Sequence, residues 1–289
     1  MMDKRLYSPK YVRQILNKYG FKFSKGLGQN FLVDGNIVRR ISEVGHITQE
    51  DYVLEIGPGI GTLTEELALN AKKVVAVELD RALLPILDET LKDYNNIEIV
   101  QGDILDMDIH SLIEEKLEGG PIKVVANLPY YITTPIIARL IEEGLNIESI
   151  IVMVQKEVAD RIVAGPGTKQ YGSLSVFVNF YTYSEILITV PKTVFMPQPK
   201  VGSAVIGLRL KEELPQVDRE IFFKVVKAAF GKRRKTILNS LSNSKLGLEK
   251  EIIKEVLEKS NIPLTERAEN LKIKDFVKIS KTLAPLDIY

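Results

Sequence analysis

The sequence predicts an α/β protein, with an open and mainly parallel sheet followed by a small all-helical domain. Short apolar runs that are typical of buried strands alternate with helical patterns over the first two thirds of the chain. From residue 218 onward, apolar residues recur only at helical spacing, and Pro215 interrupts the chain just before. We therefore place one domain at residues 1–214, with residues 1–34 as an N-terminal arm and covering loop, and a helical domain at residues 215–289.

Composition narrows the classes of protein to consider. The chain has 289 residues, of which 45% are hydrophobic and 27% charged, as in a soluble globular protein with a large core. It has no cysteine, which excludes disulfides, thiolate zinc sites and cysteine nucleophiles, and its two histidines argue against a histidine-based metal site. No apolar run approaches the length of a membrane span and no secretory signal is visible at residues 1–20, so we expect a cytoplasmic protein without a metal.

A glycine-rich turn follows the first predicted strand. The strand covers residues 51–56, the turn residues 57–62, and a helix starts at Leu63. This order is typical of the first unit of a Rossmann-like sheet, in which glycine lets the backbone approach a ligand closely. Thr62 stands where a dinucleotide fingerprint places its last glycine. The turn therefore favours a nucleoside-type ligand over the alternative, an NAD-dependent oxidoreductase.

Carboxylates end the next two predicted strands. Residues 73–77 form a strand that leads into Glu78, about twenty residues past the first glycine, where a carboxylate accepts hydrogen bonds from ribose hydroxyls. Residues 97–100 form another strand, and Asp103 follows it, where it can accept from an adenine amino group. Each acid alone is more often a solvated loop residue, but their shared place at strand ends predicts a ligand site.

The turn Asn127-Leu128-Pro129-Tyr130 follows the predicted strand at residues 122–126. Asn127 offers an acceptor and a donor, Pro129 stiffens the turn, and Tyr130 offers a flat ring on which a base can stack. Acceptors beside an aromatic plane suit the exocyclic amine of a purine. The alternative is an ordinary turn into the helix expected at residues 133–143.

The rest of the first domain supplies a loop and a final hairpin. Residues 23–32 read as a loop that folds over a ligand or, alternatively, as a linker into a helix that Asp34 caps. We expect the last strands at residues 174–183 and 201–210, after one at 149–154.

Two prolines separate these last strands. Residues 194–199 contain Pro197 and Pro199, so regular strand pairing is not expected there. The segment holds Phe195 near the carboxyl edge of the sheet. Phe195 is therefore either an aromatic wall of the site or a hydrophobic staple under the hairpin.

Basic residues gather in two stretches of this chain, whose net charge is only +1. One stretch is residues 1–25. The other, residues 221–245, contains no acid and holds Lys224, Lys227, Lys232, Arg233, Arg234, Lys235 and Lys245. Such a patch either binds phosphate or is a solvated helix face.

Together the motifs resemble those of the rRNA adenine N6,N6-dimethyltransferases of the KsgA type, over nearly the whole chain. The matching segments are residues 27–32, 55–61, Glu78, 102–103, 127–130 and 195–201. The resemblance implies a class I SAM-dependent methyltransferase fold, with a seven-stranded sheet whose last strands are antiparallel. It implies S-adenosylmethionine as methyl donor and no metal. The implied substrate is two adjacent adenosines near the 3′ end of small-subunit (16S) rRNA in an immature 30S-type particle, met by a monomeric enzyme.

The resemblance also implies roles for single residues. Asn30 and Leu32 close over the cofactor, Gly57 lies against its methionine part, Glu78 holds its ribose, Asp103 holds its adenine amine, and Asn127 contacts cofactor and target. The catalytic set is Asn127, Pro129, Tyr130 and Phe195. In this set, Asn127 and a backbone carbonyl of the turn accept hydrogen bonds from the target amine, while Tyr130 and Phe195 hold the base between two rings.

Two positions depart from the pattern of the family. Tyr131 stands where many relatives have asparagine, and Gly202 where an acid is common. Both concern the target side. A macrolide-resistance 23S rRNA adenine N6-methyltransferase is the nearest alternative, but its turn usually reads Asn-Ile-Pro-Tyr. A ribosome-assembly factor with residual methyltransferase activity is another.

Overall fold

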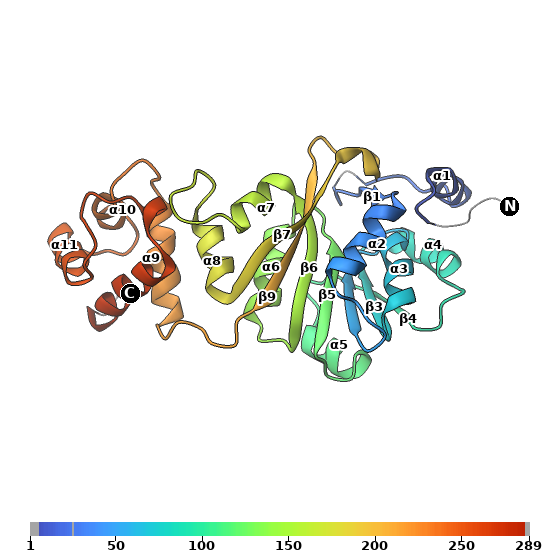
Figure 1. Ribbon diagram of the computed structural model, residues 1–289, viewed down its shortest axis with the longest axis horizontal. Helices are drawn as coiled ribbons and strands as arrows, with labels where there is room; N and C mark the ends of the chain where they lie inside the picture. The colour runs from blue at the N-terminus through green and yellow to red at the C-terminus, as the bar shows by residue number, and fades with distance from the viewer. Residues whose placement is uncertain (1–5, 25, 287–289) are drawn as a thin grey trace. The chain divides into compact units, whose positions relative to one another are not determined.

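The computed structural model describes residues 6–24 and 26–286, so residues 1–5 and 25 of the predicted N-terminal arm lie outside the description (Figure 1). The chain divides into two compact units. Unit 1 comprises Met1–Ala159 and Tyr183–Leu210, and unit 2 comprises Asp160–Thr182 and Lys211–Tyr289.

Unit 1 is built on a seven-stranded sheet with the order β4-β3-β2-β5-β6-β9-β7. Its strands are β2 (Tyr52–Ile56), β3 (Lys73–Glu78), β4 (Ile97–Gln101), β5 (Ile122–Asn127), β6 (Ile147–Gln155), β7 (Thr182–Val190) and β9 (Ser203–Leu210). β4, β3, β2, β5 and β6 pair in parallel, whereas β9 runs antiparallel to β6. The predicted fold class is confirmed.

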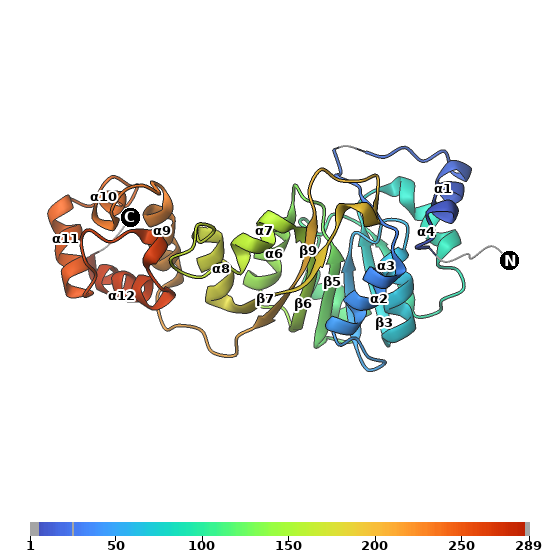
Figure 2. The ribbon, with the colours of Figure 1, turned by 45° about the horizontal axis from the view of Figure 1, so that its top comes forward.

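Helices and two short strands complete unit 1, as Figures 1 and 2 show. The helices are α1 (Pro9–Lys18), α2 (Gly35–Val44), α3 (Thr62–Asn70), α4 (Leu84–Thr90), α5 (Ile109–Lys116), α6 (Thr133–Glu142) and the start of α7 (Lys156–Ile162). The strands β1 (Phe31–Leu32) and β8 (Phe195–Met196) form an antiparallel pair of their own. The prolines after Met196 do not prevent this two-residue pairing, which the sequence analysis did not expect.

The core of the sheet explains why its strands read as continuous apolar runs. Val53, Val74 and Val125, on three neighbouring strands, share one buried cluster with Val38 of α2 and Leu67 of α3. Strands covered on both faces have few solvent-facing positions for polar residues. Burying each such side chain stabilises the fold by about 1.5–3 kcal/mol.

Aspartates start several of the helices. The Asp34 carboxylate accepts hydrogen bonds from the backbone N–H groups of Asn36, at 2.9 Å, and Ile37, at 3.1 Å. The predicted cap of α2 is thus confirmed. Asp108 and Asp218 cap α5 and α9 (Arg219–Phe230) in the same way. Such a cap is worth about 1 kcal/mol.

Unit 2 contains a helix where the sequence analysis expected a strand. Residues 174–183 were expected to be extended, but α8 (Ser173–Tyr181) occupies most of this range and β7 starts only at Thr182. Periodicity alone cannot distinguish a short apolar run in a strand from one in a buried helix. Tertiary packing decides here, because Phe177 and Phe180 lie against Phe223 and Phe222 of α9, with ring centroids 5.4 Å and 4.6 Å apart.

The same aromatic packing makes unit 2 discontinuous in sequence. Residues 160–182 belong with the C-terminal helices α9, α10 (Ile237–Ser242), α11 (Lys250–Lys259) and α12 (Ile273–Leu283). The predicted boundary at residue 214/215 differs from this division, in which the second crossing falls after Leu210. Among the residues that the structure describes, no helix is long and apolar enough to cross a membrane.

Candidate active site

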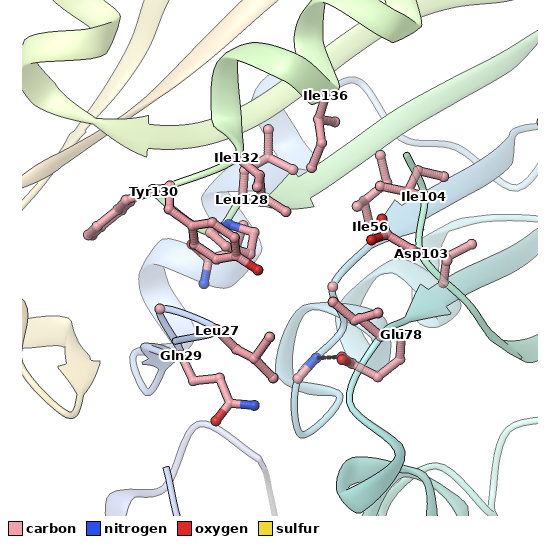
Figure 3. A pocket seen from close by; sticks show the side chains of 18 of the residues that line it. Leu27, Gln29, Ile56, Glu78, Asp103, Ile104, Leu128, Tyr130, Ile132 and Ile136 are labelled. Carbon is pink, nitrogen blue, oxygen red and sulfur yellow. Dashed lines mark hydrogen bonds between the residues drawn. The ribbon is translucent and has the colours of Figure 1, made fainter. Parts of the chain in front are cut away.

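A pocket opens at the carboxyl ends of the central strands of unit 1. β2 continues to β3 and β4 on one side, whereas β5 continues to β6 on the other, so the connections change direction between β2 and β5. Ligands of open α/β sheets bind at this point. The pocket brings together most of the predicted site residues, namely Asn30, Gly57, Glu78, Asp103, Asn127, Pro129 and Tyr130. Figure 3 shows Leu27 and Gln29 facing Leu128 and Ile132 across an open space, with Glu78 and Asp103 at its side.

Glu78 ends β3 and is held by backbone donors. Its Oε2 accepts from Gly59 N at 3.1 Å, drawn in Figure 3, and its Oε1 accepts from Asp80 N at 2.8 Å. Burial raises the pKa of Glu78, and these two N–H groups oppose the shift. The side chain is only 6% exposed and lines the pocket. It is therefore a fixed acceptor for hydroxyl groups of a ligand.

The glycine-rich turn leaves the pocket wall open. Gly57 has a φ of +71°, and no atom lies within 4 Å of the position that a Cβ would take. A ligand can therefore approach its backbone directly. Gly59 has a φ of +62°, and a Cβ there would lie 3.0 Å from the Phe31 ring. The first glycine keeps space for a ligand, and the second keeps space for the covering loop.

Asp103 follows β4 and keeps one carboxylate oxygen available. Its Oδ1 accepts from Leu105 N at 2.8 Å, and within residues 6–24 and 26–286 no group pairs with Oδ2. Arg139 of α6 stabilises the loop that follows Asp103, because its guanidinium donates hydrogen bonds to the carbonyls of Ile104 and Met107. This role could not be predicted from the sequence, since Arg139 lies in an ordinary helical pattern far from Asp103 in the chain.

Asn127 joins the covering loop to the strand-end turn. Its Nδ2 donates to the backbone carbonyl of Asn30 at 3.1 Å, and the Asn30 side chain donates to Gly28 O at 2.9 Å. One of the two N–H donors of the Asn127 amide is thus already used. Its carbonyl oxygen has no partner in the described part of the chain and remains an acceptor for a target.

The two carbonyls of the following turn differ in their availability. Pro129 O accepts from Ile132 N at 3.3 Å and from Thr133 Oγ1 at 3.0 Å. Leu128 donates its N–H to Met153 O at 3.1 Å, but its carbonyl has no partner among the described residues. The Leu128 carbonyl is therefore the second free acceptor, and Pro129 shapes the turn.

Tyr130 is fixed by a partner that the sequence analysis missed. Its hydroxyl forms a hydrogen bond of 2.8 Å with Ser203 Oγ, and Ser203 is fully buried in β9. Burial raises the pKa of Tyr130, while the bond to Ser203 lowers it. The bond holds the ring in one orientation. The sequence contains no signal that the start of β9 lies next to the turn.

The side chain of Gln29 fixes the position of the covering loop through two hydrogen bonds. Gln29 Nε2 donates to Asp80 Oδ2 at 2.6 Å, and Gln29 Oε1 accepts from Ser24 N at 2.8 Å. Asp80 also caps a short turn through Ala82 N. The glycine and amide pattern of residues 23–32 predicted a covering loop, but not that Gln29 ties it to the segment after β3.

Two predicted residues do not line the pocket. Phe195, in β8, is 4% exposed and lies in the buried cluster with Val190 and Val194, and the structure does not bring its ring to the pocket wall. Leu32 pairs with it across β1 and β8, is 3% exposed, and borders only a small neighbouring cavity with Gly57 and Asn127. Strand pairing explains both positions, because it turns the two side chains toward the core. The buried position of Phe195 agrees with the alternative interpretation, a hydrophobic staple under the hairpin.

Tyr131, one of the two departures from the family pattern, lines the pocket. The residue is 51% exposed, and a Cβ on Gly28 would lie 3.4 Å from its ring. Burial raises the pKa of Tyr131, and the charges of Asp103 and Glu78 add to this.

The residues present fit S-adenosylmethionine. Two strand-end carboxylates provide acceptors for a ribose and an adenine amine, Ile104 gives an apolar surface, and Gly57 leaves backbone open for the amino-acid part. Within the ranges described above, no group of acidic or histidine residues could hold a metal ion.

Comparisons with known proteins show the family of the chain. A family model described as ribosomal RNA adenine dimethylase matches residues 20–284. The ribosomal RNA small subunit methyltransferase A of Alkaliphilus metalliredigens (strain QYMF) is 52% identical over 285 residues, which is 98% of this chain and 99% of the relative. The protein of the same name from Clostridioides difficile (strain 630) is 51% identical, over 96% of this chain and 97% of the relative.

Solved structures are similar as well. A dimethyladenosine transferase from Plasmodium falciparum has a TM-score of 0.74 at 26% identity, covering 89% of this chain and 98% of that one. The 23S rRNA methyltransferase ErmE has a TM-score of 0.67 at 26% identity, covering 88% and 100%. The family model spans residues of both units. The chain belongs to the ribosomal RNA adenine dimethylase family.

Proposed function

We propose that this protein dimethylates the N6 atoms of two adjacent adenosines near the 3′ end of small-subunit rRNA, with S-adenosylmethionine as methyl donor. We further propose that it acts as a monomer in the cytoplasm on an immature small-subunit particle. The observation that carries the proposal is the pair of free acceptors, Asn127 Oδ1 and Leu128 O, beside a pocket that offers acceptors for a nucleoside cofactor.

The reaction makes modest demands on the protein. The lone pair of an adenine amine is delocalised into the ring, so the nitrogen is a weak nucleophile. Hydrogen bonds from its two N–H groups to Asn127 and Leu128 favour a pyramidal nitrogen whose lone pair is available. The bound cofactor supplies a methyl group that its sulfonium already activates. Positioning and electrostatics then do most of the catalysis.

The base must leave its stack to reach the turn. Tyr130 offers a ring at the pocket, held by Ser203, and stacking on it is worth about 1–3 kcal/mol. Pro129 keeps the turn rigid, because its carbonyl is bound to the start of α6. A second aromatic contact by Phe195 requires its ring to leave the core, so we assign the target site to the other three residues of the predicted catalytic set.

The relatives favour the small subunit over the large one. Those that are 51–52% identical carry the small-subunit name, whereas the 23S rRNA enzyme is 26% identical. The turn reads Asn-Leu-Pro-Tyr at residues 127–130. The intact acceptors also favour an active enzyme over an assembly factor with residual activity.

The test is methylation in a purified system. The protein is incubated with labelled S-adenosylmethionine and either small subunits or 23S rRNA from cells that lack the modifications, and the digested RNA is analysed by mass spectrometry. We expect N6,N6-dimethyladenosine at two adjacent positions of small-subunit rRNA. Methylation of 23S rRNA alone would show that the substrate is wrong, and no methylation of either would contradict the proposed activity.

A further inference from the structure

Gln29 lies in the covering loop and uses both ends of its side-chain amide. Its Nε2 donates to Asp80 Oδ2 at 2.6 Å, and its Oε1 accepts from Ser24 N at 2.8 Å. The side chain lines the pocket, and in Figure 3 its amide nitrogen points to the side on which Glu78 lies. The bond to Asp80 joins an amide donor to a carboxylate, and such charge-assisted bonds are about twice as strong as neutral ones. Gln29 therefore fastens the loop firmly to the segment that follows β3.

Asp80 connects Gln29 to the carboxylate that ends β3. The backbone N–H of Asp80 donates to Glu78 Oε1 at 2.8 Å, while Asp80 Oδ1 accepts from Ala82 N at 3.0 Å. Asp80 is thus held on both sides, and its other oxygen, Oδ2, is the atom that Gln29 binds. A single residue therefore links the proposed ribose acceptor to the covering loop.

The residue after Gln29 holds the amide of Asn127. The backbone carbonyl of Asn30 accepts from Asn127 Nδ2 at 3.1 Å. Because the two ends of a planar amide move together, a bond that fixes Nδ2 also fixes the direction of Oδ1, the acceptor proposed for the target amine. A displacement of Asn30 would turn or release this acceptor. Misplacement of a catalytic group by about 1 Å can cost about 10²-fold in rate.

Apolar packing of the loop does not supply the same precision. Phe31 is 6% exposed and packs against the rings of Phe21 and Phe23, with centroids 5.9 Å and 5.3 Å apart. Hydrophobic contacts of this kind are not directional, whereas hydrogen bonds have a preferred geometry. The aromatic cluster keeps Phe31 buried, and the polar contacts of Gln29 decide where the backbone next to Asn30 lies.

We propose that Gln29 is a positioning residue for methyl transfer, which orients the Asn127 amide by holding Asn30 in place. Contacts run from Glu78 through Asp80 to Gln29, and from the adjoining Asn30 to Asn127. They cross the pocket from the acids that suit a cofactor to the acceptor that suits a target. The inference rests on the proposed function for the reaction that Asn127 promotes.

The test exchanges the donor and the acceptor of the Gln29–Asp80 bond. Gln29→Glu places two carboxylates against each other where the present bond is 2.6 Å long, so the contact is lost. Adding Asp80→Asn restores a donor and an acceptor in reversed order. The N–H groups of Ser24 and Ala82 still meet oxygens in this double variant. The double variant should therefore regain the contact that the single variant loses.

Gln49→Glu is the matched control. Gln49 also donates to a distant backbone carbonyl, that of Leu69 at 2.8 Å, but it lies just before β2, at the end of the strand away from the pocket. The control makes the same change of side chain and charge, so it reports general effects of the substitution. Thermal unfolding is compared for all variants, and Gln29→Ala replaces Gln29→Glu if the latter does not fold.

The first measurement is steady-state methylation of small subunits that lack the modification, at varied S-adenosylmethionine. We expect Gln29→Glu to lower kcat at least about tenfold at saturating cofactor, because the acceptor of Asn127 is no longer fixed. The double variant should return kcat to within about threefold of the wild type, since the two changes act on one contact. The control should keep the kcat of the wild type.

The second measurement does not depend on activity. In protein with isotope-labelled asparagine and without RNA, the side-chain amide signal of Asn127 is assigned by its loss in Asn127→Ala. We expect this NMR signal to shift or broaden in Gln29→Glu, to return in the double variant, and to stay unchanged in the control. A loop that contributed only to stability would leave the signal of the folded protein in place.

Several results would overturn this inference. A loss confined to the KM for S-adenosylmethionine, with normal kcat, would show that Gln29 only helps the cofactor to bind. An equal loss in Gln49→Glu, or a double variant as slow as the single one, would show that the contact with Asp80 is not the cause. If the wild type does not methylate small subunits, the proposed function fails, and the NMR signal decides the inference separately: an unperturbed signal in Gln29→Glu would mean that Gln29 does not position Asn127.

Discussion

The active-site pocket has two walls that are built differently. We call the side with Glu78 and Asp103 the cofactor wall, and the side with Asn127 and Tyr130 the target wall. On the cofactor wall, each acid is held by backbone groups close to it in sequence or in the neighbouring turn: Glu78 by Gly59 and Asp80, and Asp103 by Leu105. On the target wall, the side chains of Asn127 and Tyr130 are each held by a segment far away in sequence. Asn127 bonds to Asn30, and Tyr130 bonds to Ser203.

This difference predicts how amino-acid substitutions affect each wall. A locally held acid keeps its position as long as its own turn is folded. A group held from 73 or 97 residues away depends on the position of the covering loop and of the first residue of β9. We therefore expect substitutions on the target wall to affect turnover and substitutions on the cofactor wall to affect affinity.

The largest expected effect is that of Asn127→Ala. This change removes one of the two acceptors for the amine and the bond that holds Asn30. We expect both methylation steps to slow by about 10²–10³-fold, the range for loss of one preorganised electrostatic contact. A time course of mono- and dimethyladenosine at saturating cofactor is the measurement. A normal first methylation would break the proposed division between the walls.

The sequence predicted the cofactor wall more completely than the target wall. Strand-end acids and a glycine turn are local features, so Gly57, Glu78 and Asp103 could be placed from their positions after apolar runs. The bonds of Tyr130 to Ser203 and of Gln29 to Asp80 depend on how distant segments meet. The sheet was predictable for the same reason as the cofactor wall, whereas α8 depended on aromatic packing against α9.

Phe195 offers a direct test of the target wall. Phe195→Ala should lower the free energy of unfolding by about 3–5 kcal/mol, because it empties a buried site. Phe195→Leu keeps most of the volume and is the matched control. We expect the leucine variant, measured by denaturant unfolding and by mass spectrometry, to fold and to give the wild-type ratio of mono- to dimethyladenosine. Accumulation of monomethyladenosine would instead mean that the ring contacts the base during turnover.

Glu55 lies between the two walls and should make stability depend on pH. Both carboxylate oxygens are buried without a hydrogen-bond partner among the described residues, next to a small cavity bordered by Gly57 and Asn127. Burial raises the pKa of Glu55 to about 8. The unfolded chain releases this proton near pH 4.5, so the contribution of Glu55 to stability is fully present below that pH and is lost as the pH rises to about 8.

Glu55→Gln should therefore remove this part of the pH dependence. Without cofactor, the variant should be more stable than the wild type at pH 8 by a few kcal/mol, and the difference should shrink toward pH 5. Thermal unfolding of both proteins across this range is the measurement. Parallel curves would mean that Glu55 is already neutralised by a partner.

On the cofactor wall, Glu78→Ala should weaken S-adenosylmethionine binding at least about tenfold, since loss of a charged acceptor costs about 1.5–3 kcal/mol. Calorimetry measures this affinity. At saturating cofactor the methylation rate should recover, in contrast to Asn127→Ala. Asp103→Ala is the companion variant, because the Asp103 carboxylate lines the same pocket and keeps one oxygen free. Unchanged affinity in the Glu78 variant would remove this residue from the cofactor site.

The smallest expected effect separates the Tyr130 ring from its hydroxyl. Tyr130→Phe keeps the stacking surface and removes only the bond to Ser203, which is worth about 0.5–1.5 kcal/mol. We expect stability to fall by that amount and methylation to slow only a few-fold, because the ring remains on the pocket wall. Ser203→Ala should have the same effect, and the double variant should be little worse than either single one, since both remove the same bond. Tyr130→Ala should slow methylation much more, because the surface itself is lost. If Tyr130→Phe slowed the reaction as strongly as Asn127→Ala, the hydroxyl would have to act on the target directly, and the target wall would contain a third polar group.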